Sequence, residues 1–120
     1  MAGGDIIFRD MAQLELGTGL ATIATITASP AQHSITLKIV VCNFSSTDQG
    51  YDLKVRPTAE GSANKHFWRG SKTAGAGKLG AGKTETWDFN GPLESSVIIE
   101  GAAETANSVS VTVMRSELED

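Results

Sequence analysis

The sequence predicts an all-β protein: an antiparallel β-sandwich of seven to eight strands, of jelly-roll or immunoglobulin-like type. Three observations predict this class. Apolar side chains recur at every second residue in several segments, turn-rich stretches separate these segments at short intervals, and no segment has the pattern of a clear amphipathic helix. A chain of 120 residues has the usual size of one domain, so no second domain is expected.

The clearest strands are expected in residues 33–43, 51–56 and 108–115. Successive side chains of a strand point to opposite faces, so each segment should bury one face and expose the other. Their β-branched content also suits a pleated surface better than a helix. The apolar positions of the three segments are Ile35, Leu37, Ile39, Val41, Tyr51, Leu53, Val55, Val109, Val111 and Val113.

Weaker strand signals complete the expected set. They fall at Gln13–Leu16, Leu20–Ala28, Asn64–Arg69, Lys83–Phe89 and Ser96–Gly101. In LATIATITA the apolar residues Leu20, Ile23 and Ile26 recur every three residues, which does not fit simple alternation. A bulged or two-sided strand is therefore expected in this segment.

The two ends of the chain differ in character from the strands. Ile6, Ile7 and Phe8 form an apolar patch ahead of the first expected strand, and such a patch should not stay exposed in a soluble monomer. It either packs on its own domain or reaches a neighbouring subunit as an arm. The chain is accordingly divided into an N-terminal arm at 1–12, a β-sandwich domain at 13–115 and an acidic tail at 116–120.

A glycine-rich stretch matches the phosphate-binding pattern G-x-x-x-x-G-K-[ST] through Gly77, Gly82, Lys83 and Thr84. A working P-loop joins a buried parallel strand to a helix whose N-terminus holds the phosphates. Here GSKTAGA precedes the pattern and is no buried strand, while ETWDFNGP follows it with the pattern of a strand. Since GAGK simply occurs twice, a hairpin loop is expected. A nucleotide hydrolase using Lys83 and Thr84 is the weakest alternative.

Composition limits the chemistry further. A formal net charge of −4 argues against a nucleic-acid partner. Cys42 is the single cysteine, in an apolar setting that predicts an inert buried thiol, and His33 and His66 lack metal-ligand spacing. Neither a secretory signal nor an apolar run of the roughly 20 residues that a membrane helix needs is found. We expect no catalytic residue, metal, cofactor or membrane partner, and no meaning for the sequon Asn43-Phe44-Ser45.

Aromatic residues supply one more candidate contact. In KHFWRG, Phe67, Trp68 and Arg69 place aromatic rings beside a cation, which suits stacking on a sugar ring or anchoring a partner. The alternative is that Phe67 or Trp68 fills the end of the sandwich. Trp87 and Phe89 alternate with polar residues, so core packing is expected for them.

The order of features resembles a group of small β-rich structural proteins of tailed bacteriophages. The resemblance rests on AQLELGTGLATIATITASPAQHSITLKIVVCNFSST, then VRPTAEGSANKH, then LGAGKTETWDFNGPLESSVIIEGAAETANSVSVTV, and it covers roughly residues 12–114. The family often has an aromatic-valine-proline-alanine-glycine turn where this chain reads ITASPAQHS, so only Pro30 and Ala31 keep that pattern.

The resemblance implies a virion component without enzymatic activity, assembled in the cytoplasm of a bacterial host. Its partners would be other virion proteins, either major capsid or tail proteins, and further copies of itself in a homo-oligomer. Capsid decoration through adhesion between subunits is the leading hypothesis, with Ile6, Ile7 and Phe8 as the docking arm. The alternatives are a tail, neck or fibre-associated component, or a glycan-binding module for host contact that uses Trp68 and Arg69.

Overall fold

The computed structural model describes residues 5–27, 34–59, 67–70, 72, 77–91 and 95–119, with the backbone alone for 5–11, 67–69 and 117–119. These ranges form eight strands and no helix. None of them contains a helix with the length and apolar character that a membrane span requires. The strands are β1 (Asp5–Glu15), β2 (Ala21–Ile26), β3 (Ser34–Asn43), β4 (Tyr51–Pro57), β5 (Phe67–Gly70), β6 (Thr84–Gly91), β7 (Val97–Ala103) and β8 (Val109–Glu119).

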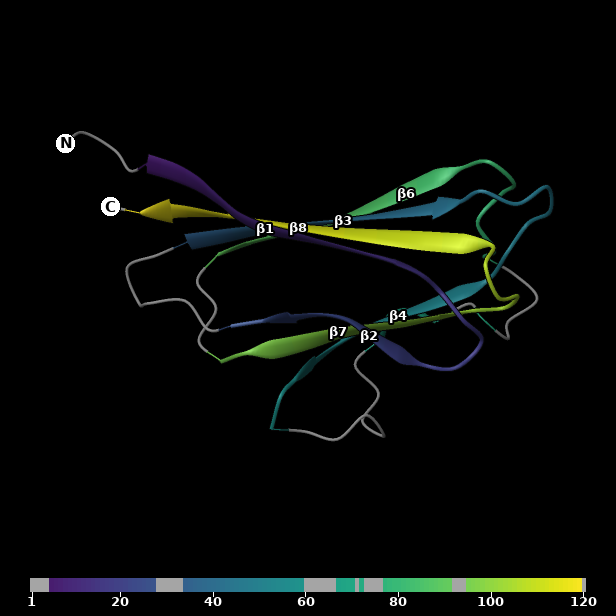
Figure 1. Ribbon diagram of the computed structural model, residues 1–120, viewed down its shortest axis with the longest axis horizontal. Coiled ribbons are helices and arrows are strands. Elements are labelled where there is room, and N and C mark those ends of the chain that lie inside the picture. The colour runs from purple at the N-terminus through teal and green to yellow at the C-terminus, as the bar shows by residue number, and fades with distance from the viewer. Residues whose placement is uncertain are drawn as a thin grey trace.

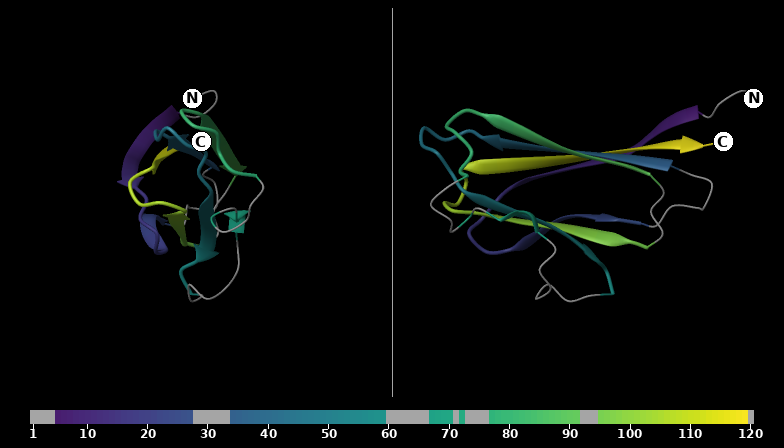
Figure 2. Two further views of the ribbon diagram at one scale, coloured as in Figure 1. Left: turned by 90° about the vertical axis from the view of Figure 1, so that its right-hand side faces the viewer. Right: turned by 180° about the vertical axis from the view of Figure 1, so that it is seen from behind.

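The strands form two four-stranded antiparallel sheets that stack face to face (Figures 1 and 2). Sheet A has the order β1-β8-β3-β6 and sheet B the order β2-β7-β4-β5. The first strand therefore pairs with the last, the second with the seventh, the third with the sixth and the fourth with the fifth. This is a long antiparallel ribbon folded over on itself, which is the jelly-roll arrangement. The all-β prediction is confirmed, and the strand order selects the jelly roll over the immunoglobulin-like alternative.

The core lies between the two sheets and follows the predicted alternation. On sheet A, Ile39 lies opposite Val113 and Val41 opposite Val111, and all four are buried. Leu53 of β4 packs into the same cluster from sheet B. Each side chain of this size contributes about 1.5–3 kcal/mol when it leaves water. The inward faces of β3, β4 and β8 are thus the ones that the sequence predicted.

Strand β2 contains the irregularity that its three-residue spacing predicted. Its pairing with β7 shifts register between Thr22 and Ala24. A bulge inserts one extra residue, so two side chains three positions apart can point to the same face. Ile23 and Ile26 accordingly both lie in the core, while Leu20 stays exposed in the preceding loop. The prediction of a bulged strand is confirmed.

The ends of the chain are more ordered than the sequence suggested. Strand β1 begins at Asp5, which lies opposite Glu119 of β8, and the pairing continues to Glu15 with a register shift between Phe8 and Asp10. The expected arm at 1–12 and the expected tail at 116–120 therefore both contribute residues to sheet A, except for 1–4 and 120, which lie outside the described residues. Neither segment was expected to form a strand, but the described residues of the two pair with each other.

The outer face of sheet B departs from the expected wet face. Lys54 and Glu100 lie opposite each other on β4 and β7, on the side away from the core, yet they are only 1% and 5% exposed. Arg56 Nε–H donates a hydrogen bond of 2.6 Å to Glu100 Oε1. Buried charges persist where opposite charges pair and hydrogen-bond. The alternation identified the outward face correctly, but the inference that this face is wet was wrong at these positions.

Candidate functional site

Four connections between strands gather at one end of the sandwich, where β1, β3, β5 and β7 lead into β2, β4, β6 and β8 (Figure 2). Backbone hydrogen bonds tie them together: Gln49 and Leu79 exchange two, and Phe44 N–H donates to the carbonyl of Ser108 at 3.0 Å. Asn107 N–H donates to the carbonyl of Leu16 at 3.1 Å. The described loops at this end form a single hydrogen-bonded layer.

Asn43 is the centre of this layer. It is fully buried, and its Nδ2 donates to the carbonyls of Thr47 and Leu79 at 2.8 and 2.9 Å. Its Oδ1 accepts hydrogen bonds from the Ser45 backbone N–H at 3.0 Å and the Ser45 hydroxyl at 2.7 Å. Nδ2 is the atom that an N-linked glycan would occupy, and both of its hydrogens are engaged. The sequon is therefore a structural clamp in the folded chain.

The phosphate-binding pattern forms a turn ahead of a strand. Lys83 N–H donates to the carbonyl of Gly80 at 3.0 Å, and Gly82 has a φ of 70°, which suits glycine at the third position of a tight turn. Thr84 then begins β6 instead of a helix. Without a helix N-terminus the anion-binding geometry of a P-loop is not formed. The prediction of a loop ahead of a strand is confirmed, but the loop does not close a hairpin, because it joins β5 of sheet B to β6 of sheet A.

Glu104 joins two neighbouring loops at this end. Its Oε1 accepts a hydrogen bond of 3.0 Å from the Gly50 backbone N–H, and its Oε2 accepts one of 2.8 Å from Lys78 Nζ. The hydrogen bond from Lys78, followed by that from Gly50, lowers the pKa of Glu104 below its ordinary value. The carboxylate is solvent-exposed, so this contact is a surface clip.

The predicted contact residues lie in two different outer strands. The first set, Ile6, Ile7 and Phe8, belongs to β1 at one edge of sheet A. The second set, Phe67, Trp68 and Arg69, belongs to β5 at one edge of sheet B. Since β1 lies against β2, at the opposite edge of sheet B from β5, the fold does not bring the two sets together. Their roles in partner contact stay predictions.

The remaining candidates have structural positions. Trp87 and Phe89 are half-buried and pack against the core, as expected, and Trp87 Nε1–H donates to the Tyr51 hydroxyl at 3.0 Å. Cys42 is half-buried on the outer face of β3, less enclosed than predicted, because it alternates with the inward Val41. His33 and His66 lie outside the described residues. Within the described ranges, no three His, Cys, Asp or Glu side chains gather in a way that could hold a metal ion.

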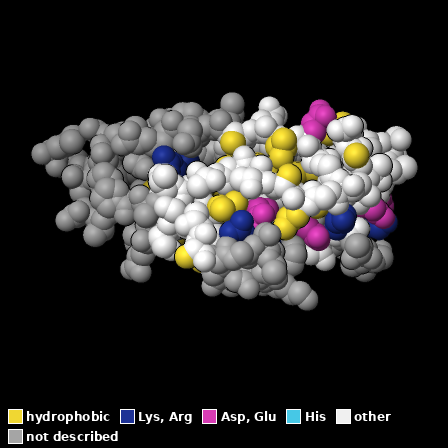
Figure 3. Space-filling view, turned by 60° about the horizontal axis from the view of Figure 1, so that its bottom comes forward, with side chains coloured by type: hydrophobic (Ala, Val, Ile, Leu, Met, Phe, Trp, Pro, Cys, Tyr) yellow, Lys and Arg dark blue, Asp and Glu magenta, His cyan; other side chains and the backbone are white. Residues whose placement is uncertain are grey.

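Charge is mixed on the surface that carries sheet B. In the coloured part of Figure 3, basic and acidic side chains lie next to one another, with hydrophobic side chains between them. A nucleic-acid site would show one extended basic patch. The coloured part of this face has none.

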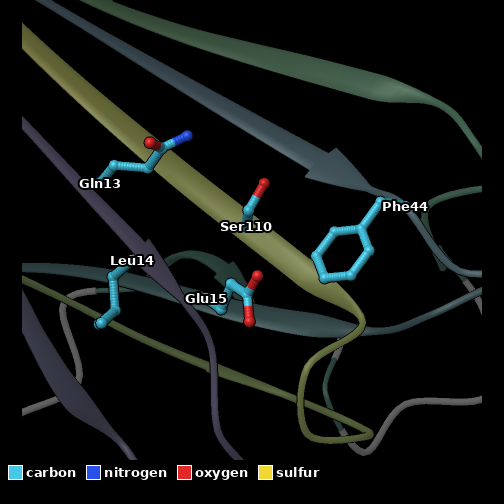
Figure 4. A pocket seen from close by; sticks show the side chains of 5 residues that line it. All are labelled: Gln13, Leu14, Glu15, Phe44 and Ser110. Atoms are coloured by element: carbon cyan, nitrogen blue, oxygen red, sulfur yellow. The ribbon is translucent and has the colours of Figure 1, made fainter.

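Sequence reasoning missed one exposed aromatic residue at the loop end. Phe44 is 48% exposed and borders a depression that Gln13, Leu14, Glu15 and Ser110 also line (Figure 4). These residues come from three separate segments, so no spacing along the chain links them. Only the register of β1 with β8 brings Glu15 opposite Ser110.

The fold and this surface define an eight-stranded jelly-roll domain whose described loops are joined by hydrogen bonds at one end. No family model and no curated protein match the chain. It is similar to a chain of the Bacillus endospore appendages, described as a novel family of disulfide-linked pili, with 9% identity and a TM-score of 0.51, over 97% of this chain and 89% of the other.

Two viral structures are also similar. One is the acidic stable capsid structure of the Helicobacter pylori bacteriophage KHP30, with 15% identity, coverage of 96% and 86%, and a TM-score of 0.49. The other is the coat protein of Tobacco streak virus, with 10% identity, coverage of 99% and 88%, and a TM-score of 0.49. Identities this low establish a likeness of fold alone.

Proposed function

We propose that this chain is a non-enzymatic structural protein of a virion and that it decorates the capsid of a tailed bacteriophage. The observation that carries the proposal is the strand order of the two sheets, because the jelly roll is a common fold of viral capsid domains. The resemblance of residues 12–114 to small virion proteins of tailed phages supports the same role. The similar Bacillus appendage protein, described as forming pili, shows the fold in another assembling subunit.

Adhesion between subunits is the proposed mechanism. Outer strands present backbone N–H and C=O groups to their surroundings, and the outer strands here are β1 and β6 in sheet A and β2 and β5 in sheet B. β1 also contains Ile6, Ile7 and Phe8, each of which can contribute about 1.5–3 kcal/mol if a neighbouring subunit buries it, before ordering costs. A symmetric ring or shell repeats each such contact and so increases the overall avidity of the assembly.

Immunogold electron microscopy tests the role directly. An antibody raised against the purified chain is applied to virus particles from the bacterium that produces it. We expect regular labelling of the head surface. Labelling confined to the tail or neck would replace capsid decoration with the tail, neck or fibre-associated alternative. Particles that contain no detectable chain, by labelling and by mass spectrometry, would contradict the virion assignment.

Light scattering tests the homo-oligomer. The purified chain is passed through a sizing column with light-scattering detection over a range of concentrations, and we expect a mass that is a multiple of 12.6 kDa. The Phe8→Ser variant should shift the mass toward that of the monomer. Leu20→Ser, which changes another apolar residue, is the control and should leave the mass unchanged. An unchanged oligomer for the Phe8 variant would remove β1 from the interface.

A further inference from the structure

The depression beside Phe44 has the size and position of a small-molecule site. It is an open depression of about 360 Å³ near the loop end of sheet A, at the edge that β1 forms. Volumes of roughly 300–1,000 Å³ are usual for sites that take small ligands. Figure 4 shows the Phe44 ring extending over the sheet toward Ser110, with Glu15 and Gln13 on the neighbouring strand and Leu14 turned to the other side.

The aromatic ring is presented from a rigid backbone. Phe44 N–H is held by the carbonyl of Ser108 at 3.0 Å, and the preceding residue is the buried Asn43 clamp. Only Leu20, at 39%, is a comparably exposed large hydrophobic side chain among the described residues. A backbone held in this way has little freedom to lose when a ligand stacks on the ring, and such preorganisation favours binding.

The polar side chains around the ring are available to hydrogen-bond a ligand. Gln13 and Glu15 alternate with Leu14 on β1, and the register places Glu15 opposite Ser110. Within the described part of the chain, the side chains of Gln13, Glu15 and Ser110 make no hydrogen bond. Those of the adjacent loop are by contrast largely engaged: Asn43, Ser45 and Thr47 make hydrogen bonds within the loop, and Asp48 accepts one from the Ala81 backbone N–H. Carboxylate, carboxamide and hydroxyl groups together offer both donors and acceptors to a ligand.

This combination selects a ligand with one apolar face and a rim of hydroxyl groups. The Glu15 carboxylate disfavours phosphate and other anions, as does the formal net charge of −4. One carboxylate with two neutral groups is also too few ligands for a divalent cation. A pyranose ring meets the requirement, because its C–H face stacks on an aromatic ring and adjacent hydroxyls donate to a carboxylate.

We propose that this depression binds a neutral hexopyranose ring, with Phe44 as the stacking platform and Glu15, Gln13 and Ser110 as hydrogen-bonding partners. The site differs from the glycan contact expected at Trp68 and Arg69. It does not depend on the chain being a capsid protein, since it rests only on the geometry of sheet A and the loop after β3.

Nuclear magnetic resonance titration of the full chain tests the proposal. The isotope-labelled protein is titrated with the methyl glycosides of glucose, mannose, galactose and N-acetylglucosamine, which differ in the orientation or substitution of single hydroxyl groups. At least one should give saturable amide shifts, with millimolar affinity, centred on Glu15, Phe44 and Ser110. If none of the four shifts these amides, the proposal is wrong.

Two variants and their controls identify the contacts. Phe44→Ala should weaken binding at least tenfold, whereas Leu20→Ala, at the other exposed apolar side chain of this end, should leave the affinity unchanged. Glu15→Gln should weaken binding several-fold, and Asp88→Asn, an exposed carboxylate on β6 of the same sheet, should not. The spectra themselves report whether each variant is folded. Equal binding by a folded Phe44→Ala variant would overturn the site.

Discussion

Gly101 shows how one residue limits the packing of the core around β7. It is buried on β7, and a Cβ atom there would lie 3.0 Å from Ile23 Cδ1, 3.1 Å from Leu16 Cδ2 and 3.2 Å from the carbonyl oxygen of Asp52. Contacts this short require the neighbours to move. Two of the three atoms belong to core side chains and the third to the backbone, so the space for that movement is small.

Replacing Gly101 by Ala should therefore destabilise the protein. We expect the free energy of unfolding to fall by about 1–3 kcal/mol, the usual cost of overpacking, with the dependence on urea concentration unchanged. Urea unfolding followed by tryptophan fluorescence measures both quantities. Gly19→Ala is the matched control, because no atom lies within 4 Å of its added Cβ. If both variants lose the same stability, the close approach at Gly101 does not limit packing.

At the level of elements, β1 and β8 depend on each other. β8 lies between β1 and β3, so the loss of β1 would leave one of its edges without a partner. Residues 5–12 supply most of that pairing, through contacts from Asp5 opposite Glu119 to Ala12 opposite Val113. The sequence predicted that residues 1–12 form an arm separate from the sandwich domain. The register argues against this.

Deleting residues 1–12 should lower stability by several kcal/mol, since each backbone hydrogen bond contributes about 1 kcal/mol net. The exposed edge of β8 should also promote aggregation. Thermal unfolding and light scattering measure the two effects. Deleting residues 1–4 alone is the control, because it leaves every described pair of β1 intact. A deletion variant that lacks residues 1–12 and is as stable as the full chain would restore the interpretation of this segment as a separate arm.

At the scale of the whole molecule, the loop end behaves as one unit, and Glu104 makes its stability depend on pH. The folded-state pKa of Glu104 is lowered, chiefly by the hydrogen bond from Lys78 Nζ and then by that from the Gly50 N–H. A lowered pKa means that the folded state favours the charged form. The stabilisation is complete above the unfolded-state pKa, about 4.3 for Glu, and is lost as the pH falls through the folded-state value.

The Glu104→Gln variant should thus be less stable than the original chain at neutral pH, with the difference shrinking in acid as Glu104 becomes protonated. Urea unfolding of both proteins at neutral pH and at several acidic values measures this difference. Lys78→Met removes the other partner of the same contact. The double variant should lose less unfolding free energy than the sum of the losses of the two single variants. A stability difference that does not change with pH would exclude the clip as its cause.

Much of this fold could be predicted from local sequence patterns. Alternation identified the inward faces of β3, β4 and β8, and the three-residue spacing of Ile23 and Ile26 indicated the bulge of β2. The flanking strand-like segment also identified the glycine-rich loop as a turn ahead of β6. These features depend on residues close together in the chain, which is why a sequence pattern contains them.

Long-range pairing decided the rest. Three features join segments that are distant in sequence. The start of β1 at Asp5 pairs with the end of β8 at Glu119, and Lys54 and Glu100 are buried side by side. Gln13 and Glu15 are likewise grouped with Phe44. Side-chain periodicity says which way a residue points, but not which strand or loop will lie above it. The sequence by itself thus determined that this protein is a sandwich of alternating strands. Only the tertiary structure decided the jelly-roll order and the surface beside Phe44, because both arise from contacts between strands whose partners no local pattern specifies.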